Sequence, residues 1–134
     1  MNRRYLLEQC NRLRAIDKDE NLLHNHQKDQ LWLDHNAGHE FILNMLVDYI
    51  DDKEFLKKKE LIRLLNREIR KANSVIKELD IKYNHFKNDE DMTPEDSYIY
   101  SYSDGTCCEA MTLKDIIKRE RHISKNAYIS TKWF

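Results

Sequence analysis

The amino-acid sequence predicts a mainly α-helical protein: a long antiparallel helical hairpin, similar to a coiled coil, followed by a small C-terminal ββα(β) module. Three observations predict this. The 134 residues include only two glycines and one proline, and sheet-rich folds need more turn-forming residues than that. Hydrophobic residues recur every three or four positions through the middle of the chain. After residue 96 the pattern changes to alternation, which is typical of a strand.

Two helices are expected before the middle of the chain. The first covers about Arg3 to Ile16 and places several apolar residues on one face. Asp17 is a suitable N-cap for a second helix, and Glu20 stands in the capping-box position three residues later. This second helix is expected to continue to about Ile50.

A third helix, from Lys53 to Phe86, carries the strongest periodic pattern. Its apolar positions follow alternating spacings of three and four, as in the a/d seam of a coiled coil. The seam consists of Ile62, Leu65, Ile69, Ala72, Ile76, Leu79, Tyr83 and Phe86. Because only a short Asp51-Asp52 link precedes this helix, we expect it to pack antiparallel to the second. Gly38 and Ala72 are small enough to let two helices approach closely.

Some apolar residues lie beside the seam and would be partly exposed in a two-helix unit. They are Leu61, Leu64 and Val75. Exposed apolar surface of this kind favours association with a partner, or a docked N-terminal helix that covers it. We therefore expect self-association, as a dimer or a larger oligomer.

The predicted domain organisation has three parts: a helical region (1–87), an acidic linker (88–96) and a small α/β module (97–134). In the module, the alternating segment 97–103 is the first strand, and Asp104-Gly105 is the preferred pair for a type I′ hairpin turn. Residues 106–111 form the return strand. A helix follows from Thr112 to about residue 122, and 127–133 is either a third strand or a short helix.

Charge and cysteine content limit the possible environment. The formal net charge of −1 implies no global attraction to nucleic acid or to acidic membranes. Three cysteines, two of them adjacent, do not form a disulfide framework and favour a reducing compartment. The N-terminus lacks the apolar run of a signal peptide, and the most apolar stretch, 41–50, is too short to cross a bilayer. A cytoplasmic location without membrane contact is expected.

The C-terminal module contains the main candidate binding residues. Between Thr112 and Lys132 six basic residues stand against two acidic ones, a local net charge of +4. A face of three tyrosines precedes this segment. Aromatic side chains stack on bases, and Lys and Arg bind phosphate, so the combination predicts a site for a nucleotide or nucleic acid. The residues concerned are Tyr98, Tyr100 and Tyr102 for stacking, and Lys118, Arg119 and Arg121 for phosphate. The alternative is that the tyrosines pack the module onto the helices.

His35 and His39 share a helix face at an i, i+4 spacing, which can place two imidazoles on one Zn²⁺ or Fe²⁺, and Asp34 or Glu40 could supply an oxygen ligand. His35 is also in line with Leu31 and Ile42, however, and no HExxH motif is present. Structural histidines are therefore favoured over a metal site, and no cofactor is expected. With only two glycines, far apart, the chain has no glycine-rich phosphate loop.

In size and in its bias toward Asn, Lys, Ile and Tyr, the chain resembles the small accessory proteins of bacteriophages. The resemblance rests on composition and covers no motif. It implies a host-directed or anti-defence role in the cytoplasm of a host cell, such as sequestering a signal nucleotide.

The sequence thus favours a non-catalytic, oligomeric binding protein for a nucleotide-type ligand or nucleic acid. Three alternatives remain open. One is a protein–protein inhibitor of a host enzyme that acts through its helical faces. Another is a metal-dependent helical hydrolase that uses the carboxylates near residues 48–54. The third is a helix-turn-helix reader of duplex DNA at 112–130.

Overall fold

The computed structural model describes the backbone of residues 1–26, 29–51, 53 and 55–131, and the side chains of these residues except 24–26 and 121–131. It contains α1 (Arg3–His26), α2 (Gln30–Asp51), α3 (Lys58–Lys82), the short 3₁₀ helix η1 (Asp89–Asp91) and α4 (Pro94–Thr131). Within the described ranges there is no strand. The mainly α class is confirmed, and the predicted C-terminal ββα(β) module is wrong.

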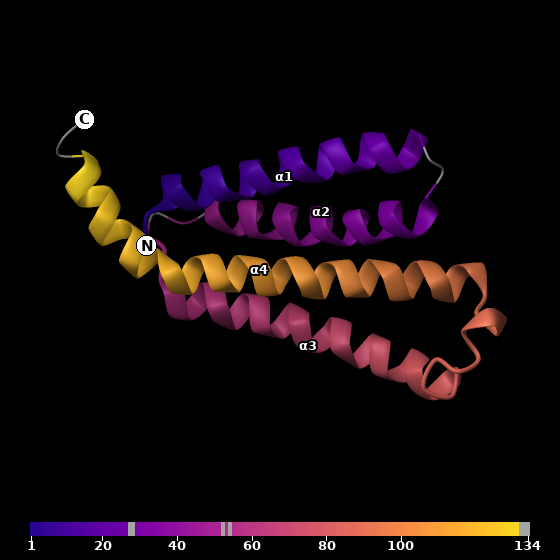
Figure 1. The fold of residues 1–134 in the computed structure, drawn as a ribbon. Helices are drawn as coiled ribbons and strands as arrows, with labels where there is room; N and C mark the ends of the chain where they lie inside the picture. Colours follow the sequence, from indigo (N-terminus) through magenta and orange to yellow (C-terminus); the bar gives the residue numbers. More distant parts are fainter. Residues whose placement is uncertain (27–28, 52, 54, 132–134) are drawn as a thin grey trace.

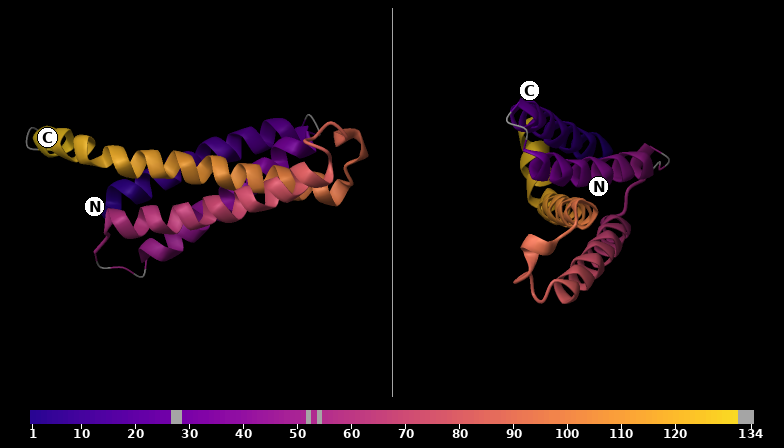
Figure 2. Two further views of the ribbon diagram at one scale, coloured as in Figure 1. Left: turned by 90° about the horizontal axis from the view of Figure 1, so that it is seen from below. Right: turned by 90° about the vertical axis from the view of Figure 1, so that its right-hand side faces the viewer.

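The four long helices alternate in direction, and α4 lies between α2 and α3 (Figure 1). The right-hand view in Figure 2 shows the same order. The principal helix contacts are those of α4 with α2, of α4 with α3, and of α1 with α2. The predicted pairing of the second and third helices into an antiparallel hairpin is therefore wrong, because α4 occupies the place between them. Residues 97–120 belong to the same bundle as α1 to α3.

The boundary between the first two helices is also not where the capping signal placed it. Helix α1 continues through Asp17 and ends at His26. The Asp17 side chain does not cap a helix but is buried, and its Oδ1 atom lies 2.9 Å from Nδ1 of His39 on α2. A carboxylate that has a tertiary partner is not available as a local cap.

Helix α3 follows its predicted seam closely. Every seam residue is buried or half-buried; the buried ones are Leu65, Ala72, Leu79 and Tyr83. Leu61, on which the expected self-association partly rested, is fully buried within the single chain, whereas Leu64 and Val75 are half-buried. The exposed apolar surface beside the seam is therefore smaller than the sequence indicated.

Helix α3 ends at Lys82, earlier than predicted. Asn84, His85 and Phe86 have φ angles of 51°, 57° and 60°, in the left-handed region that bulky residues rarely adopt. The backbone N–H of His85 donates to the carbonyl of Asp80 (2.7 Å), and that of Asn88 donates to the carbonyl of Tyr83 (3.1 Å). These bonds hold the sharp turn that leads the chain back toward α4.

Helix α4 begins with a strong local signal. The Thr93 hydroxyl accepts a hydrogen bond from the backbone N–H of Asp96 (3.1 Å), and Pro94 occupies the first helical position, where its missing N–H costs nothing. The acidic residues 95 and 96 then lie in the first turn, where the helix dipole favours negative charge. The last residues of the expected linker, 94–96, are therefore the first turn of α4.

The first half of α4 buries small and polar residues instead of large apolar ones. The buried residues are Ser101, Ser103, Gly105, Thr106, Cys107, Glu109 and Ala110. Small side chains let α4 fit closely between α2 and α3. They also remove the hydrophobic period of 3.6 that would have indicated a helix in the sequence.

The chain's two glycines meet where α2 crosses α4. A Cβ atom on Gly38 would lie 2.1 Å from the carbonyl oxygen of Tyr102, and one on Gly105 would lie 1.9 Å from that of His35. Both obstacles are backbone atoms. Gly38 permits a close helix contact, as expected, but the contact is with α4 and not with α3. Gly105 lies in the same contact and does not form a hairpin turn.

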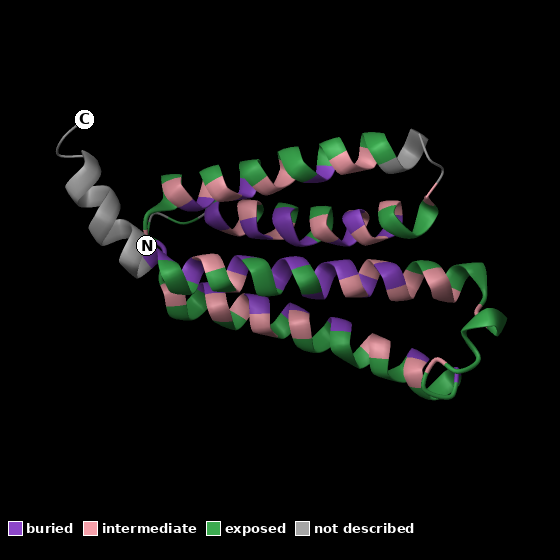
Figure 3. Cartoon of the chain, in the orientation of Figure 1, coloured by how far each residue is buried: buried purple, intermediate pink, exposed green. Residues whose placement is uncertain are grey.

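The interior differs between the two ends of the bundle. At one end, apolar side chains from all four helices form a dry core: Leu6, Cys10, Ile42, Leu43, Leu46, Ile50, Leu56, Leu61, Leu65, Ala110, Leu113 and Ile117. Toward the end of α1 and the beginnings of α2 and α4, the buried positions instead carry polar or ionisable groups. Figure 3 shows buried residues along α2 and along the described part of α4. Buried ionisable groups need partners, which makes the polar end a candidate location for a site.

None of the described helices is both long enough and apolar enough to cross a membrane.

Candidate functional site

The three candidate tyrosines do not share one face. On a helix, Tyr98 and Tyr102 are one turn apart, and their ring centroids are separated by 5.7 Å. Tyr102 also contacts Phe41 of α2 at 5.9 Å. Tyr100 points elsewhere and packs edge-on against Phe86, with ring centroids 5.1 Å apart. The strand that would have aligned all three does not form.

The candidate phosphate-binding residues lie far from these rings. Lys118 and Arg119 are exposed on α4, and Arg119 forms an ion pair with Asp115 at 3.2 Å. The 18 positions from Tyr100 to Lys118 correspond to about 27 Å of helix at ~1.5 Å per residue. The side chain of Arg121 lies outside the described residues. Among the residues with described side chains, the structure therefore does not bring the aromatic and basic groups together.

Tyr100 does belong to a groove, which we call the aromatic groove. It consists of two adjoining hollows of about 320 Å³ and 370 Å³ that share Leu31, Tyr100 and Ser101. The beginning of α2 forms one wall and the connection from α3 to α4 forms the other. The lining residues are Leu31, Trp32, His35, Phe86, Asp89, Met92, Ser97, Tyr100, Ser101 and Asp104. Among these described residues there is no lysine or arginine.

The polar end of the bundle brings together ionisable residues from three helices. We call Asp17 of α1, His35 and His39 of α2, and Asp104 and Glu109 of α4 the junction cluster. Nδ1 of His39 lies 2.9 Å from Oδ1 of Asp17 and 3.3 Å from Oε2 of Glu109. Nε2 of His35 lies 3.2 Å from Oδ2 of Asp104. The two imidazole rings contact each other edge-on, with centroids 4.6 Å apart.

Burial and mutual charge shift the protonation of this cluster. Burial raises the pKa of Glu109 to about 7, in spite of the neighbouring His39. Burial opposes the charged form of His39, but the hydrogen bond to Asp17 and the charge of Glu109 raise its pKa above the usual value. Burial and the nearby His39 lower the pKa of His35. Near neutral pH, Glu109 and His39 are therefore protonated to a larger extent than in an unfolded chain, and His35 is protonated to a smaller extent.

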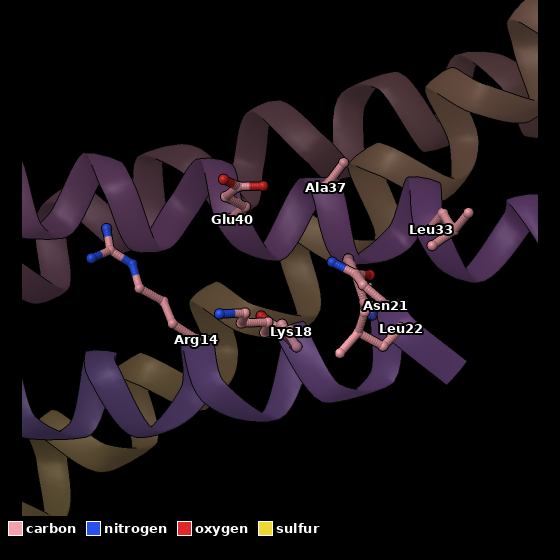
Figure 4. Close-up of a pocket in the computed structure, with 9 residues that line it drawn as sticks. Arg14, Lys18, Asn21, Leu22, Leu33, Ala37 and Glu40 are labelled. Atoms are coloured by element: carbon pink, nitrogen blue, oxygen red, sulfur yellow. Dashed lines mark hydrogen bonds between the residues drawn. The ribbon is translucent and has the colours of Figure 1, made fainter. Parts of the chain in front are cut away.

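A pocket of about 540 Å³ opens beside the junction cluster, between α1 and α2 (Figure 4). Its lining residues are Arg14, Asp17, Lys18, Asn21, Leu22, Leu33, Asn36, Ala37 and Glu40. Asn36 is 1% exposed and its amide donates to Oδ1 of Asn21 at 3.0 Å. Its Oδ1 atom, like Oδ2 of Asp17, is buried without a hydrogen-bond partner among the described residues.

Comparison with protein-family models, with curated proteins and with solved structures found no match for this chain.

Sequence reasoning identified His35 and His39 but not their partners. It considered residues adjacent on the same helix, Asp34 and Glu40, as oxygen donors. In the structure Asp34 accepts a hydrogen bond from Gln30 (2.7 Å) and Glu40 lines the pocket instead. The actual partners come from α1 and α4. No local signal could have indicated them, because Asp17 resembled a helix cap and 97–111 resembled a hairpin.

Proposed function

We propose that this protein is a non-catalytic binding protein that holds an apolar, positively charged segment of another protein in the aromatic groove. The observation that supports this is the exposure of large apolar side chains at a hollow with acidic margins. Leu31 and Trp32 on the groove wall are 59% and 46% exposed. Hydrophobic side chains gathered at a concave surface are typical of interaction sites.

The acidic residues of the aromatic groove indicate which kind of partner it can bind. Asp89 and Asp104 line the groove, and η1 beside it consists entirely of acidic residues. Lysine or arginine side chains on the partner would complement these carboxylates, whereas the phosphates of a nucleotide would be repelled. Among the described residues, the three tyrosines expected to bind a base do not lie beside Lys118 or Arg119, and the side chain of Arg121 is outside these residues. Binding to a protein segment fits the groove better.

Selection of displayed random peptides on the full-length protein tests this proposal. We expect the enriched peptides to combine aromatic or aliphatic residues with lysine or arginine. Counter-selection on a Leu31→Asp variant removes peptides that bind elsewhere. Enrichment of acidic peptides, or of the same peptides on both proteins, would contradict the proposal.

For a selected peptide, Leu31→Ala is expected to weaken binding roughly tenfold, which corresponds to ~1.4 kcal/mol. The loss of a methylene-rich contact accounts for this amount. Fluorescence of Trp32 in a Trp133→Phe background measures the affinity. Phe55→Ala is the matched control, because Phe55 is 78% exposed but lies outside the groove. The same titration with mononucleotides and short single strands is the competing test: a saturable response to these alone would favour the nucleotide function.

A further inference from the structure

Nδ1 of His39 and the carboxylates of Asp17 and Glu109 are spaced like the ligands of a metal ion. Donor atoms of Asp17, His39 and Glu109 all lie within 4.8 Å of one another. In a tetrahedral zinc site with metal–ligand distances near 2.1 Å, the donors are about 3.4 Å apart. The distances from Nδ1 to Asp17 and Glu109, 2.9 and 3.3 Å, are already close to this value. An ion could therefore replace the proton on Nδ1 with little movement of the helices.

A second, independent observation concerns Asp17. The residue is only 8% exposed, yet its Oδ2 atom has no hydrogen-bond partner among the described residues. An unpaired carboxylate oxygen in the interior is costly. A cation held by the Asp17 carboxylate would satisfy this oxygen, directly or through a bound water.

The charge balance of the region also favours a cation. Around His39 lie Asp17, Glu109 and, at longer range, Glu20. Asp17 and Glu109, both buried, lie on either side of this one imidazole, and a divalent ion would offset their charges in the ionised state. Asp17 also lines the 540 Å³ pocket between α1 and α2, which brings solvent close to this carboxylate.

We propose that Asp17, His39 and Glu109 bind one divalent first-row transition-metal ion, which ties α1, α2 and α4 together at the polar end of the bundle. One imidazole nitrogen with two carboxylates suits Zn²⁺, Mn²⁺ or Fe²⁺ better than the all-oxygen cations Mg²⁺ and Ca²⁺. The site is separate from the aromatic groove, so it does not depend on the function proposed there. Bundle proteins commonly build metal sites from inward-facing residues on different helices.

The test is a titration of chelator-stripped, full-length protein with Zn²⁺, followed by calorimetry, and with Co²⁺, followed by its visible spectrum. We expect one equivalent of each ion to bind, and we expect Mg²⁺ to bind at least a hundredfold more weakly. Asp17→Asn and Glu109→Gln should each weaken Zn²⁺ binding at least tenfold. Circular dichroism of the metal-free variants establishes that they are folded. Glu109→Gln keeps the size of the side chain and therefore serves if Asp17→Asn does not fold.

Cys108→Ser is the matched control. Cys108 belongs to a neighbouring set of donors with His35 and Asp104, and its replacement should leave Zn²⁺ binding unchanged. Three outcomes would overturn the proposal: no stoichiometric binding by the folded protein, binding that both carboxylate variants retain, or binding that is lost only in Cys108→Ser.

Discussion

Replacing Gly105 with alanine is expected to destabilise the fold by about 3 kcal/mol. In an isolated helix the same change would stabilise by about 1 kcal/mol, because alanine is the better helix former. Here the new methyl group would lie 1.9 Å from the carbonyl oxygen of His35. Since a backbone atom cannot rotate away, α2 and α4 must separate, and their contact is among the principal ones in the bundle.

Chemical denaturation monitored by circular dichroism measures the effect. Ser74→Ala, at an exposed position of α3, is the control and should be neutral or slightly stabilising. Gly38→Ala should act like Gly105→Ala. The double variant should cost less than the sum of the two, because both single changes already separate the same pair of helices. A stable Gly105→Ala variant would show that α2 and α4 do not cross at the glycines.

The stability of the metal-free protein is expected to fall as the pH rises from about 5 to 8, because of Glu109. The ordinary pKa of a glutamic acid side chain is 4.5, and the fold raises that of Glu109 to about 7. Between these values the folded state binds a proton that the unfolded state has released, so the free energy of unfolding decreases with pH. Across the whole window this amounts to about 3 kcal/mol, from ~1.4 kcal/mol per pH unit.

The other titratable groups near Glu109 also contribute to the pH dependence of stability, and the direction of each pKa shift gives the sign of its contribution. The raised pKa of His39 acts in the same direction, since its contribution is present below pH 6.5 and is lost above it. The lowered pKa of His35 acts in the opposite direction, because the unfolded chain binds the extra proton below pH 6.5. Asp17, Glu20 and Arg12 on α1 also influence Glu109 through their charges. The comparison of wild type with Glu109→Gln measures the contribution of Glu109, including its effect on the pKa of His39.

We expect Glu109→Gln to be more stable, relative to wild type, at pH 8 than at pH 5, by about 3 kcal/mol. Glutamine keeps the shape of the protonated acid and cannot ionise. Urea unfolding at both values, in the presence of chelator, provides the measurement, and Glu95→Gln on an exposed turn is the control. Parallel pH profiles for wild type and Glu109→Gln would mean that Glu109 is not buried beside His39.

The sequence was informative where one face of a helix is lined by large apolar residues. Along α3 the seam positions from Ile62 to Tyr83 are all buried or half-buried, as predicted. The pattern could not identify the partner of that face. Antiparallel packing against the preceding helix was the economical choice, but α4 supplies the contact.

The C-terminal segment was misinterpreted because two local signals conflicted. Thr93 and Pro94 are a good helix start, whereas the alternating tyrosines and Asp104-Gly105 are a good hairpin. The tertiary environment decided between them. A strand pair at 97–111 could not have filled the narrow space between α2 and α3, and a helix with a glycine and small residues on its buried faces could.

The sequence by itself determined the helical class, the buried face of α3 and the importance of a small residue at Gly38. Only the tertiary structure decided the order of the helices and the composition of the candidate sites. The physical reason is that periodicity reports which face of a helix avoids water, and it contains no information on the surface against which that face packs. Asp17, His39 and Glu109 are separated by 22 and 70 positions in the sequence, and they meet only because α1, α2 and α4 pack together around the half-buried imidazole of His39.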